Sequence, residues 1–345
     1  TLQSAINSLP DGGIVQFRAG DIDMTEQIFI RGKRLEFVGA GSGLNKRGRL
    51  TRLIGTPPSP VVDEAGNLIL RAEAVTGMFN LIAAQVVFRD VMITGTNAAA
   101  VIHDDEAGNS APAIFQDMVI DGSGRGILSL GSGTLTIKDT VIQNTLWHGV
   151  SMKAPFHGEL TIPNLILDDS KILHSVCGGT YFENTTVFLS DVTVIGALCG
   201  GIVGYKSTGV ILDSLLLDNY KAGIILVEAT GSPLIRDNTI VHTLPTLSLQ
   251  NWGDGVSIFS SPDVFLDRNT IQDSARAGVG IYGSGVSLQD NTMTCSAFDI
   301  DVETHNSIPP NPQDLGGNQC GCGDPLGECE AVSSQLVPDL GNLAP

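Results

Sequence analysis

The sequence is poor in basic and aromatic residues and has no long apolar run. Nineteen Lys and Arg stand against 37 Asp and Glu, giving a formal net charge of −18 over 345 residues. Nucleic acids and anionic membranes select basic patches, so neither is expected as a partner. The charge also argues mildly against a strongly anionic polysaccharide, unless local Lys and Arg or a bound cation override it. No apolar run approaches the roughly 18 residues of a membrane span.

No segment has the charged-then-apolar order of a targeting signal, and a start at Thr1 is typical of a mature or trimmed N-terminus. Cysteine is scarce and unevenly placed, with four of the six residues beyond position 290. An even number with a terminal cluster favours disulfides and a secreted, extracellular or periplasmic location. Zinc is the alternative, but the Cys-Gly-Cys at 320–322 and the step to Cys329 do not match common zinc spacings.

The sequence does contain a repeat. Each copy opens with a polar residue, usually Asp, followed by an apolar run; the openings are Asp117, Asp139, Asp169, Asp191, Asp213, Asp237, Arg268 and Asp290. Their intervals are 22, 30, 22, 22, 24, 31 and 22 residues. The two longest are interpreted as one coil plus a loop, at Ala154–Glu159 and at Leu244–Gly253. Such a period predicts a solenoid of short parallel strands, with coils about 4.8 Å apart.

The first 43 residues indicate how the coil begins. Residues 2–9 have apolar side chains at helical spacing, and short strands are predicted at 14–17, 27–30 and 35–38. The Gln-x-Ala-Ile helix, Gly-Gly-x-Val-x-Phe-x-x-Gly and Leu-x-Phe-x-Gly-Ala-Gly resemble the opening of the pectate-lyase-like superfamily of right-handed parallel β-helices. The resemblance implies an all-β helix of about 22 residues per coil, with a short N-terminal helix capping its open end.

We expect one β-helix domain over residues 1–345 and a monomer. Its predicted parts are the N-terminal cap and first coils at 1–43, irregular coils at 44–111, regular coils at 112–305 and a Cys/Pro/Gly-rich capping tail at 306–345. A cap protects strand edges from pairing with other chains. The carboxylates of the polar segment 103–109 could hold calcium, although an exposed acidic loop is the favoured interpretation.

The repeat also predicts which side chains stack on the outside, because successive residues of a strand face opposite sides. In the strand after the repeated Gly, the predicted outward pairs are Ser151 and Lys153, Tyr181 and Glu183, Val203 and Tyr205, Ile225 and Val227, Ser257 and Phe259, and Gly280 and Tyr282. The turn before this strand carries Trp147, His148, Cys177, Cys199, Lys221, Trp252, Asp254 and Arg276. The sixth residue of the coils forms another column, Asn144, His174, Asp218, His242 and Asp273.

The scarce aromatic and titratable residues therefore gather on one side of the predicted coil. Aromatic faces with interleaved polar groups bind sugar rings. The alternative is that these aromatic residues only pack beneath the inserted loops. Cys177 and Cys199 share one column, and a separation of one coil suits a disulfide. A stacked pair of thiols facing the interior is the alternative, and neither interpretation makes them catalytic.

The superfamily resemblance implies a polysaccharide-active enzyme, namely a lyase, a glycoside hydrolase or a uronate epimerase. Elimination and epimerisation need a base, an acid and a positive group, whereas hydrolysis needs two carboxyl groups about 5–10 Å apart. The candidate catalytic residues are Lys153, Glu183, His148, His174 and Tyr205. The candidate substrate-binding residues are Trp147, Tyr181, Lys206, Lys221, Trp252, Asp254, Arg276 and Tyr282. For hydrolysis, Asp218 and Asp254 join Glu183 as candidate carboxylates.

The sequence departs from the named subfamilies. It lacks the Arg-x-Pro-x-x-Arg of pectate lyases, the combined paired-Asp and Gly-His-Gly signature of polygalacturonases and the Asp-Pro-His of alginate epimerases. No subfamily's catalytic residues are therefore carried over. A non-catalytic glycan-binding or adhesin-type surface protein is the alternative, and it fits the acidic charge. An ice-binding surface is disfavoured, because the outward columns are mixed in size and charge.

Overall fold

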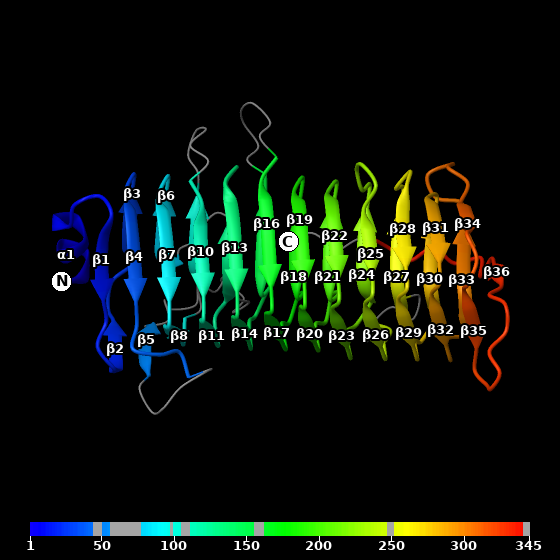
Figure 1. Ribbon diagram of the computed structural model, residues 1–345, viewed down its shortest axis with the longest axis horizontal. Helices are drawn as coiled ribbons and strands as arrows, with labels where there is room; N and C mark the ends of the chain where they lie inside the picture. The colour runs from blue at the N-terminus through cyan, green and yellow to red at the C-terminus, as the bar shows by residue number, and fades with distance from the viewer. Residues whose placement is uncertain are drawn as a thin grey trace, which may run out of the picture. The chain divides into compact units, whose positions relative to one another are not determined.

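The computed structural model describes residues 1–43, 50–55, 77–96, 99–104, 111–154, 162–246 and 252–340. Within these ranges there is one helix, α1 (Leu2–Ser8), and the strands belong to three parallel sheets, here called A, B and C (Figure 1). Each coil supplies one strand to each sheet in the order A, B, C. The chain divides into two compact units, Thr1–Ile166 and Leu167–Ala344. The predicted all-β parallel helix and its N-terminal helix are thus confirmed.

The first unit begins with the capping helix. Its sheet A holds β1 (Gly13–Gln16), β4 (Arg34–Val38), β7 (Gln85–Arg89), β10 (Ala113–Gln116) and β13 (Thr134–Lys138). Sheet B holds β2 (Gly20–Met24), β5 (Thr51–Gly55), β8 (Met92–Thr94), β11 (Val119–Asp121) and β14 (Val141–Gln143). Sheet C holds β3 (Ile28–Arg31), β6 (Gly77–Ile82), β9 (Ala99–Asp104), β12 (Arg125–Ser129) and β15 (Val150–Lys153). Gln3 of α1 accepts from the Phe29 N–H and donates to the Phe29 carbonyl, so the helix satisfies the open edge of β3.

β16 (Asn164–Asp168) contains the boundary between the units, and the second unit continues the same order. Its sheet A holds β19 (Thr186–Ser190), β22 (Thr208–Leu212), β25 (Leu234–Arg236), β28 (Val264–Asp267), β31 (Gly285–Gln289) and β34 (Asn311–Asp314). Sheet B holds β17 (Lys171–Leu173), β20 (Thr193–Ile195), β23 (Leu215–Leu217), β26 (Thr239–Val241), β29 (Thr270–Gln272), β32 (Thr292–Thr294) and β35 (Gln319–Gly321). Sheet C holds β18 (Thr180–Glu183), β21 (Ile202–Tyr205), β24 (Ala222–Val227), β27 (Asp254–Phe259), β30 (Ala277–Tyr282), β33 (Phe298–Glu303) and β36 (Ala331–Val332).

In the second unit, the residue that follows a strand often has a left-handed backbone conformation, with positive φ, and turns the chain toward the next sheet. We call such a position a corner. The repeated Asp forms the corner after sheet A, with φ of 53° at Asp191 and 49° at Asp213. Asp and Asn adopt positive φ more readily than other non-glycine residues, which explains why the repeat opens with Asp. The column of His174 and Asp218 forms the corner after sheet B, with φ of 55° at both residues. Lys206 stands at the corner after sheet C, with φ of 50°.

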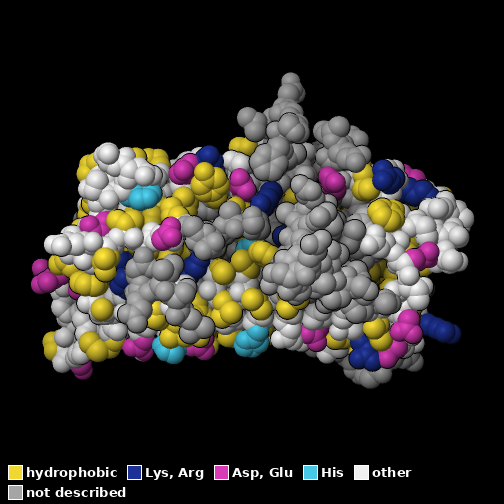
Figure 2. Space-filling model, turned by 180° about the vertical axis from the view of Figure 1, so that it is seen from behind, with side chains coloured by type: hydrophobic (Ala, Val, Ile, Leu, Met, Phe, Trp, Pro, Cys, Tyr) yellow, Lys and Arg dark blue, Asp and Glu magenta, His cyan; other side chains and the backbone are white. Residues whose placement is uncertain are grey.

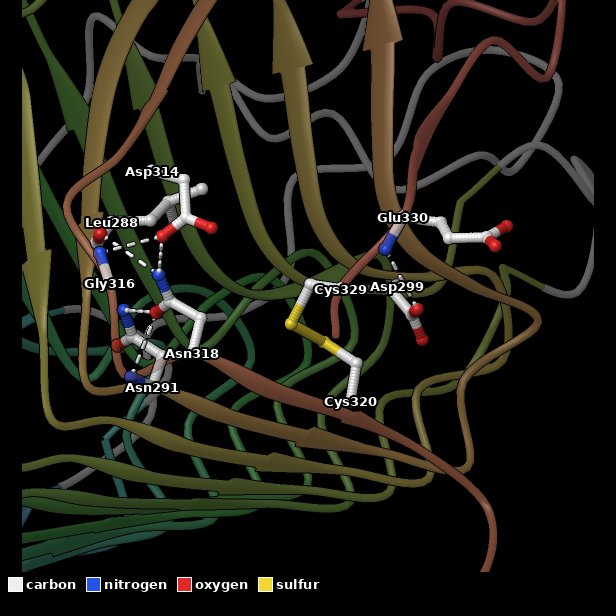
Figure 3. The surroundings of a disulfide bond; sticks show 9 residues. All are labelled: Leu288, Asn291, Asp299, Asp314, Gly316, Asn318, Cys320, Cys329 and Glu330. Atoms are coloured by element: carbon white, nitrogen blue, oxygen red, sulfur yellow. Dashed lines mark hydrogen bonds between the residues drawn. A yellow bond between two sulfur atoms is a disulfide. The ribbon is translucent and has the colours of Figure 1, made fainter. Parts of the chain in front are cut away.

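A stack of asparagines follows the corner after sheet A, in which Asn238, Asn269 and Asn291 are buried and Asn318 is half-buried. The stack consists, from coil to coil, of Asn238, Asn269, Asn291 and Asn318. In each of the last three, the side-chain oxygen accepts from the backbone and side-chain N–H groups of the asparagine in the preceding coil. Figure 3 shows the final step, where Asn318 also donates to the Leu288 carbonyl and to Asp314. The repeated Asn-Thr-Ile and Asn-Thr-Met triplets of the sequence therefore have a structural cause.

Asn269→Ala is expected to destabilise the protein by about 3 kcal/mol. The change removes partners from the backbone and side-chain N–H groups of Asn238 and from the Ile235 carbonyl. Each buried polar group left without a partner costs about 1–3 kcal/mol. Urea unfolding followed by far-UV circular dichroism measures the loss. Asn311→Ala, at an exposed position of β34, is the control and should stay within about 0.5 kcal/mol of wild type. An equal effect of both changes would contradict the structural role of the stack.

The C-terminal segment carries two of the predicted disulfides. They join Cys295 to Cys322 and Cys320 to Cys329, with Cα–Cα distances of 4.5 Å and 4.8 Å. Figure 3 shows the second of these bonds. The disulfide prediction is thus confirmed for these four cysteines. The segment also adds β34, β35 and β36, one strand to each sheet.

The described chain beyond β36 runs back against side chains of sheet C. The backbone N–H and the hydroxyl of Ser334 donate to Asp301 in β33, and Arg276 donates to the Leu336 carbonyl. Farther along, Trp252 donates to the Asp339 carbonyl. Residues 333–340, here called the tail, therefore lie over the outer face of sheet C.

Candidate functional site

The outer face of sheet C in the second unit has the columns that the repeat predicts. Tyr181 pairs in register with Val203, and Glu183 pairs with Tyr205. Strands β24, β27 and β30 extend both columns. The column of Tyr181 and Val203 continues with Ile225, Ser257 and Gly280, and the column of Glu183 and Tyr205 continues with Val227, Phe259 and Tyr282. The strand alternation that places these side chains outside was thus readable from the sequence.

Three of the predicted site residues belong to the first unit. Lys153 is half-buried at the end of β15, and Trp147 lies under the guanidinium of Arg125, 5.4 Å from its ring centre. His148 is only 1 % exposed. Burial, followed by the charges of Arg125 and Lys153, lowers the pKa of His148 to about 3. His148 is therefore neutral near neutral pH and closed to solvent, and we do not retain it as a proton carrier.

One part of the outer face in the second unit is covered. Trp252, Phe259 and Tyr282 are fully buried in an apolar cluster, against which Val337 and Leu340 of the tail pack. These side chains are therefore buried beneath the tail, whereas the alternative prediction places the outward aromatic residues beneath the inserted loops. Of the predicted loops at Ala154–Glu159 and Leu244–Gly253, residues 155–159 and 247–251 lie outside the described residues.

The covered part also contains a buried charge cluster. Arg276 donates to Asp254 at 2.5 Å and to Asp301 at 2.6 Å, and all three side chains are at most 7 % exposed. Tyr282 and Ser257 also donate to Asp254, at 2.9 Å and 2.6 Å. Two more predicted substrate-binding residues, Asp254 and Arg276, are thus engaged with each other beneath the tail. Lys221 is buried as well, and its ammonium lies 5.7 Å from the centre of the Trp252 ring.

Beside the covered part runs a row of tyrosines and charged groups, here called the tyrosine–carboxylate row: Tyr181, Glu183, Tyr205, Lys206 and Glu228. Tyr181 is itself 2 % exposed and belongs to the buried cluster, and Tyr205 packs against that cluster. Tyr181 donates to Glu183 at 3.2 Å, and Tyr205 donates to both carboxylate oxygens of Glu228 at 3.4 Å. The Lys206 ammonium lies 3.4 Å from Glu228 and 4.8 Å from the centre of the Tyr205 ring. The Lys206 and Glu228 side chains are 44 % and 45 % exposed, and Tyr205 and Glu183 are half-buried.

The electrostatics of the row follow from these contacts. Burial, followed by the charge of Glu183 and its hydrogen bond, raises the pKa of Tyr181, so this phenol stays protonated. Hydrogen bonding to Tyr205 and the nearby charge of Glu228 raise the pKa of Lys206, which stays charged. The row thus combines a neutral donor, a fixed positive charge and two carboxyl groups.

The structure brings four predicted residues together in this row and adds one that the sequence did not suggest. Glu228 stands at the corner after β24, outside the strand positions that gave the predicted outward columns. Asn184 and Lys206 hold the same corner in the two preceding coils, and this period was the available signal. His174 is exposed at the corner after β17, before β18 begins, whereas the row lies at the carboxyl ends of the sheet C strands.

A metal site is not evident in the described part of the chain. No group of three or more His, Cys, Asp or Glu residues there is arranged to hold a metal ion. Of the segment considered for calcium, His103 is buried and bonds to Ser129 and to the Ala111 carbonyl, whereas 105–109 lie outside the described residues. The same part of the chain contains no helix that could cross a membrane. Figure 2 shows hydrophobic patches with acidic and basic side chains interspersed.

Comparison with solved structures gives similarity at the level of the fold. The A-module of the Azotobacter vinelandii mannuronan C-5 epimerase AlgE4 matches with a TM-score of 0.65 at 13 % identity, over 96 % of this chain and 93 % of that one. The AlgE6 A-module of the same organism gives a TM-score of 0.58 at 14 % identity, over 96 % and 92 %.

The catalytic domain of a GH87 α-1,3-glucanase in complex with nigerose gives a TM-score of 0.50 at 13 % identity, over 89 % of this chain. The chain spans 64 % of the length of that glucanase domain. No protein-family model and no curated protein matches the sequence. By its fold, the chain is therefore a right-handed parallel β-helix protein, as the resemblance to the pectate-lyase-like superfamily predicted.

Proposed function

We propose that this protein is a secreted polysaccharide-active enzyme that hydrolyses a neutral glycan at the tyrosine–carboxylate row of the second unit. One observation carries the proposal: Glu183 and Glu228, from different coils, each accept a hydrogen bond from a tyrosine, namely the buried Tyr181 and the half-buried Tyr205. The two disulfides support secretion, since such bonds persist in oxidising compartments. The glycan-active enzymes with the same fold support a carbohydrate substrate.

The spacing of the two glutamates suits hydrolysis with inversion. Glu183 pairs with Tyr205 and Tyr205 with Val227, the residue before Glu228. Two coil spacings separate their backbones by roughly 10 Å. Inverting glycosidases place their carboxyl groups about 6.5–9.5 Å apart, which leaves room for a water molecule, and glutamate side chains can make up this difference.

The surroundings of the two carboxyl groups suggest a division of roles. Glu228 is the more exposed of the two carboxyl groups and lies beside the Lys206 ammonium, so we assign it as the base that activates water. The acid that protonates the leaving oxygen is then assigned to Glu183, the other carboxyl group of the row. Tyr205, between them, offers a half-buried ring on which a sugar can stack.

Net charge favours hydrolysis over elimination and epimerisation. Both of those reactions remove a proton next to a carboxylate of the substrate, and a net charge of −18 repels a polyanion. Lys206 is the one cation of the row, and Glu228 already pairs with it. A neutral glycan is not repelled by the negative charge of the protein. Of the three reactions, hydrolysis is the one that requires no carboxylate on the substrate.

A panel of neutral and uronate-containing polysaccharides tests the proposal. We expect new reducing ends from at least one neutral glycan and none from uronate polymers. Unsaturated products would indicate elimination in place of hydrolysis. Binding without any product would favour the non-catalytic glycan-binding protein, and neither binding nor products across the panel would contradict a glycan-directed role.

A further inference from the structure

Cys177 and Cys199 hold equivalent positions in consecutive coils of the second unit. They precede β18 and β21, whose register pairs Thr180 with Ile202. The alignment extends back to the cysteines, because the Cys199 N–H donates to the Cys177 carbonyl. Both side chains are half-buried, their thiol groups are hydrogen-bonded to each other, and no disulfide joins them in the structure.

The same arrangement already contains a disulfide elsewhere in the chain. Cys295 and Cys322 directly follow β32 and β35, whose register pairs Thr294 with Gly321. These cysteines are therefore stacked in consecutive coils, and their Cα atoms are 4.5 Å apart. A spacing of one coil, about 4.8 Å, lies within the Cα separations that a disulfide accepts. The repeat itself brings stacked cysteines to bonding distance.

We propose that Cys177 and Cys199 are a redox-active pair that closes into a third disulfide under oxidising conditions and ties the coil of β18 to the coil of β21. The two other disulfides indicate that the folded protein resides where such bonds persist. The half-buried thiols remain within reach of a small disulfide such as oxidised glutathione.

The reaction is an ordinary thiol–disulfide exchange in two steps. The Cys199 thiolate attacks one sulfur of oxidised glutathione and releases one glutathione thiolate. The Cys177 thiolate then attacks the Cys199 sulfur and releases the second glutathione. The two protein thiols are oxidised to one disulfide, and the oxidant is reduced to two thiols.

Cys199 is suited to make the first attack. Its hydrogen bond with Cys177 lowers the pKa of Cys199 to about 7, and the charge of Lys221 acts in the same direction, whereas burial opposes them. Because the thiolate is the nucleophile, the rate of closure is expected to rise with pH through about 7.

The new bond would join the two coils that carry Tyr181, Glu183 and Tyr205. A cross-link between coils restricts the unfolded chain, so the oxidised form is expected to unfold at higher urea than the reduced form. This expectation does not depend on the proposed function, because it concerns bonding and stability only.

Peptide mapping of the full chain tests the proposal. The protein is incubated with oxidised glutathione, denatured, alkylated without reduction and analysed by mass spectrometry. We expect the loss of both alkylated cysteines and the appearance of a cross-linked peptide containing Cys177 and Cys199, with the other two disulfides unchanged. The proposal is overturned if both thiols stay alkylatable, or if each retains its own glutathione.

Single serine variants provide the matched controls. Cys177→Ser is expected to retain one glutathione on Cys199, because no second thiol displaces it. Cys199→Ser is expected to react more slowly, because the attacking thiolate is gone. Equal reaction rates for the two variants would contradict the assigned order of attack. Should a variant fail to fold, the mapping of the wild-type chain alone decides whether the bond forms.

Discussion

Glu228→Gln is expected to lower the rate of glycan hydrolysis by about 10²–10⁴-fold, the usual contribution of a positioned general base. Glutamine retains the hydrogen-bond acceptor for Tyr205 but cannot take a proton from water. The Michaelis constant is expected to change little, because the side chain still fills the same space. Initial rates of reducing-end formation on the neutral glycan found in the panel measure the effect.

Glu183→Gln should produce a loss of similar size, and the double variant should lose little more than either single one, since residues that act as a unit are not additive. Glu36→Gln is the control. Glu36 lies on β4 of sheet A, in the first unit, where it pairs with Arg89 at 3.5 Å. Turnover by Glu228→Gln within a factor of two of the control would remove Glu228 from the mechanism.

Arg276→Leu is expected to reduce the free energy of unfolding by about 3–5 kcal/mol near neutral pH, the usual cost of removing one partner from a buried ion pair. The substitution leaves the carboxyl groups of Asp254 and Asp301, both fully buried, without their shared cation. Urea unfolding followed by circular dichroism measures the loss, and Trp252 fluorescence reports on the region beneath the tail.

The loss should depend on pH. Burial raises the pKa of Asp254 above its ordinary 3.8, although Arg276 and Ser257 oppose the shift. A carboxyl group with a raised folded-state pKa binds its proton more tightly when folded, so its contribution to stability falls as pH rises through that pKa. Without Arg276 the pKa of Asp254 rises further. The difference between variant and wild type should therefore shrink as pH is lowered toward 4, where a neutral Asp254 needs no cation.

Arg268→Leu is a matched control, because Arg268 also bridges two aspartates. It lies 2.7 Å from Asp237 and 2.9 Å from Asp267, but its side chain is 49 % exposed. Arg236 still pairs with Asp267 at 2.7 Å in this variant. An exposed ion pair contributes about 0–1 kcal/mol. A larger loss for Arg268→Leu than for Arg276→Leu would contradict the importance of the buried cluster.

The fold could be predicted from the sequence because the repeated residues are those that the backbone conformation and the hydrogen bonds of each coil require. Asp191 and Asp213 recur where the chain needs a left-handed corner, and Asn238 and Asn269 recur where buried backbone groups need a partner. The alternation of the sheet C strands likewise follows from a period of two. The corners, the asparagine bonds and the strand alternation depend only on residues of one coil and the next, so they can be recognised in a single sequence.

The candidate site could be predicted only in part, because exposure on the outer face depends on distant chain segments. Nothing near Trp252 in the sequence shows that the carbonyl of Asp339 will lie against its indole. The His174 column looked like a functional column because polar residues recur in it, although positive φ at a corner already favours such residues. Glu228 drew no attention because its neighbours in the column, Lys206 and Ser260, differ from it in charge.

The most direct measurement is a crystal structure of Glu228→Gln with an oligosaccharide of the glycan that the wild-type protein cleaves. We expect an ordered sugar ring against Tyr205, with a glycosidic oxygen within hydrogen-bond distance of Glu183 and a water molecule near position 228. An oligosaccharide ordered over sheet A or sheet B, with the tyrosine–carboxylate row unchanged, would contradict the assignment of the row as the glycan site.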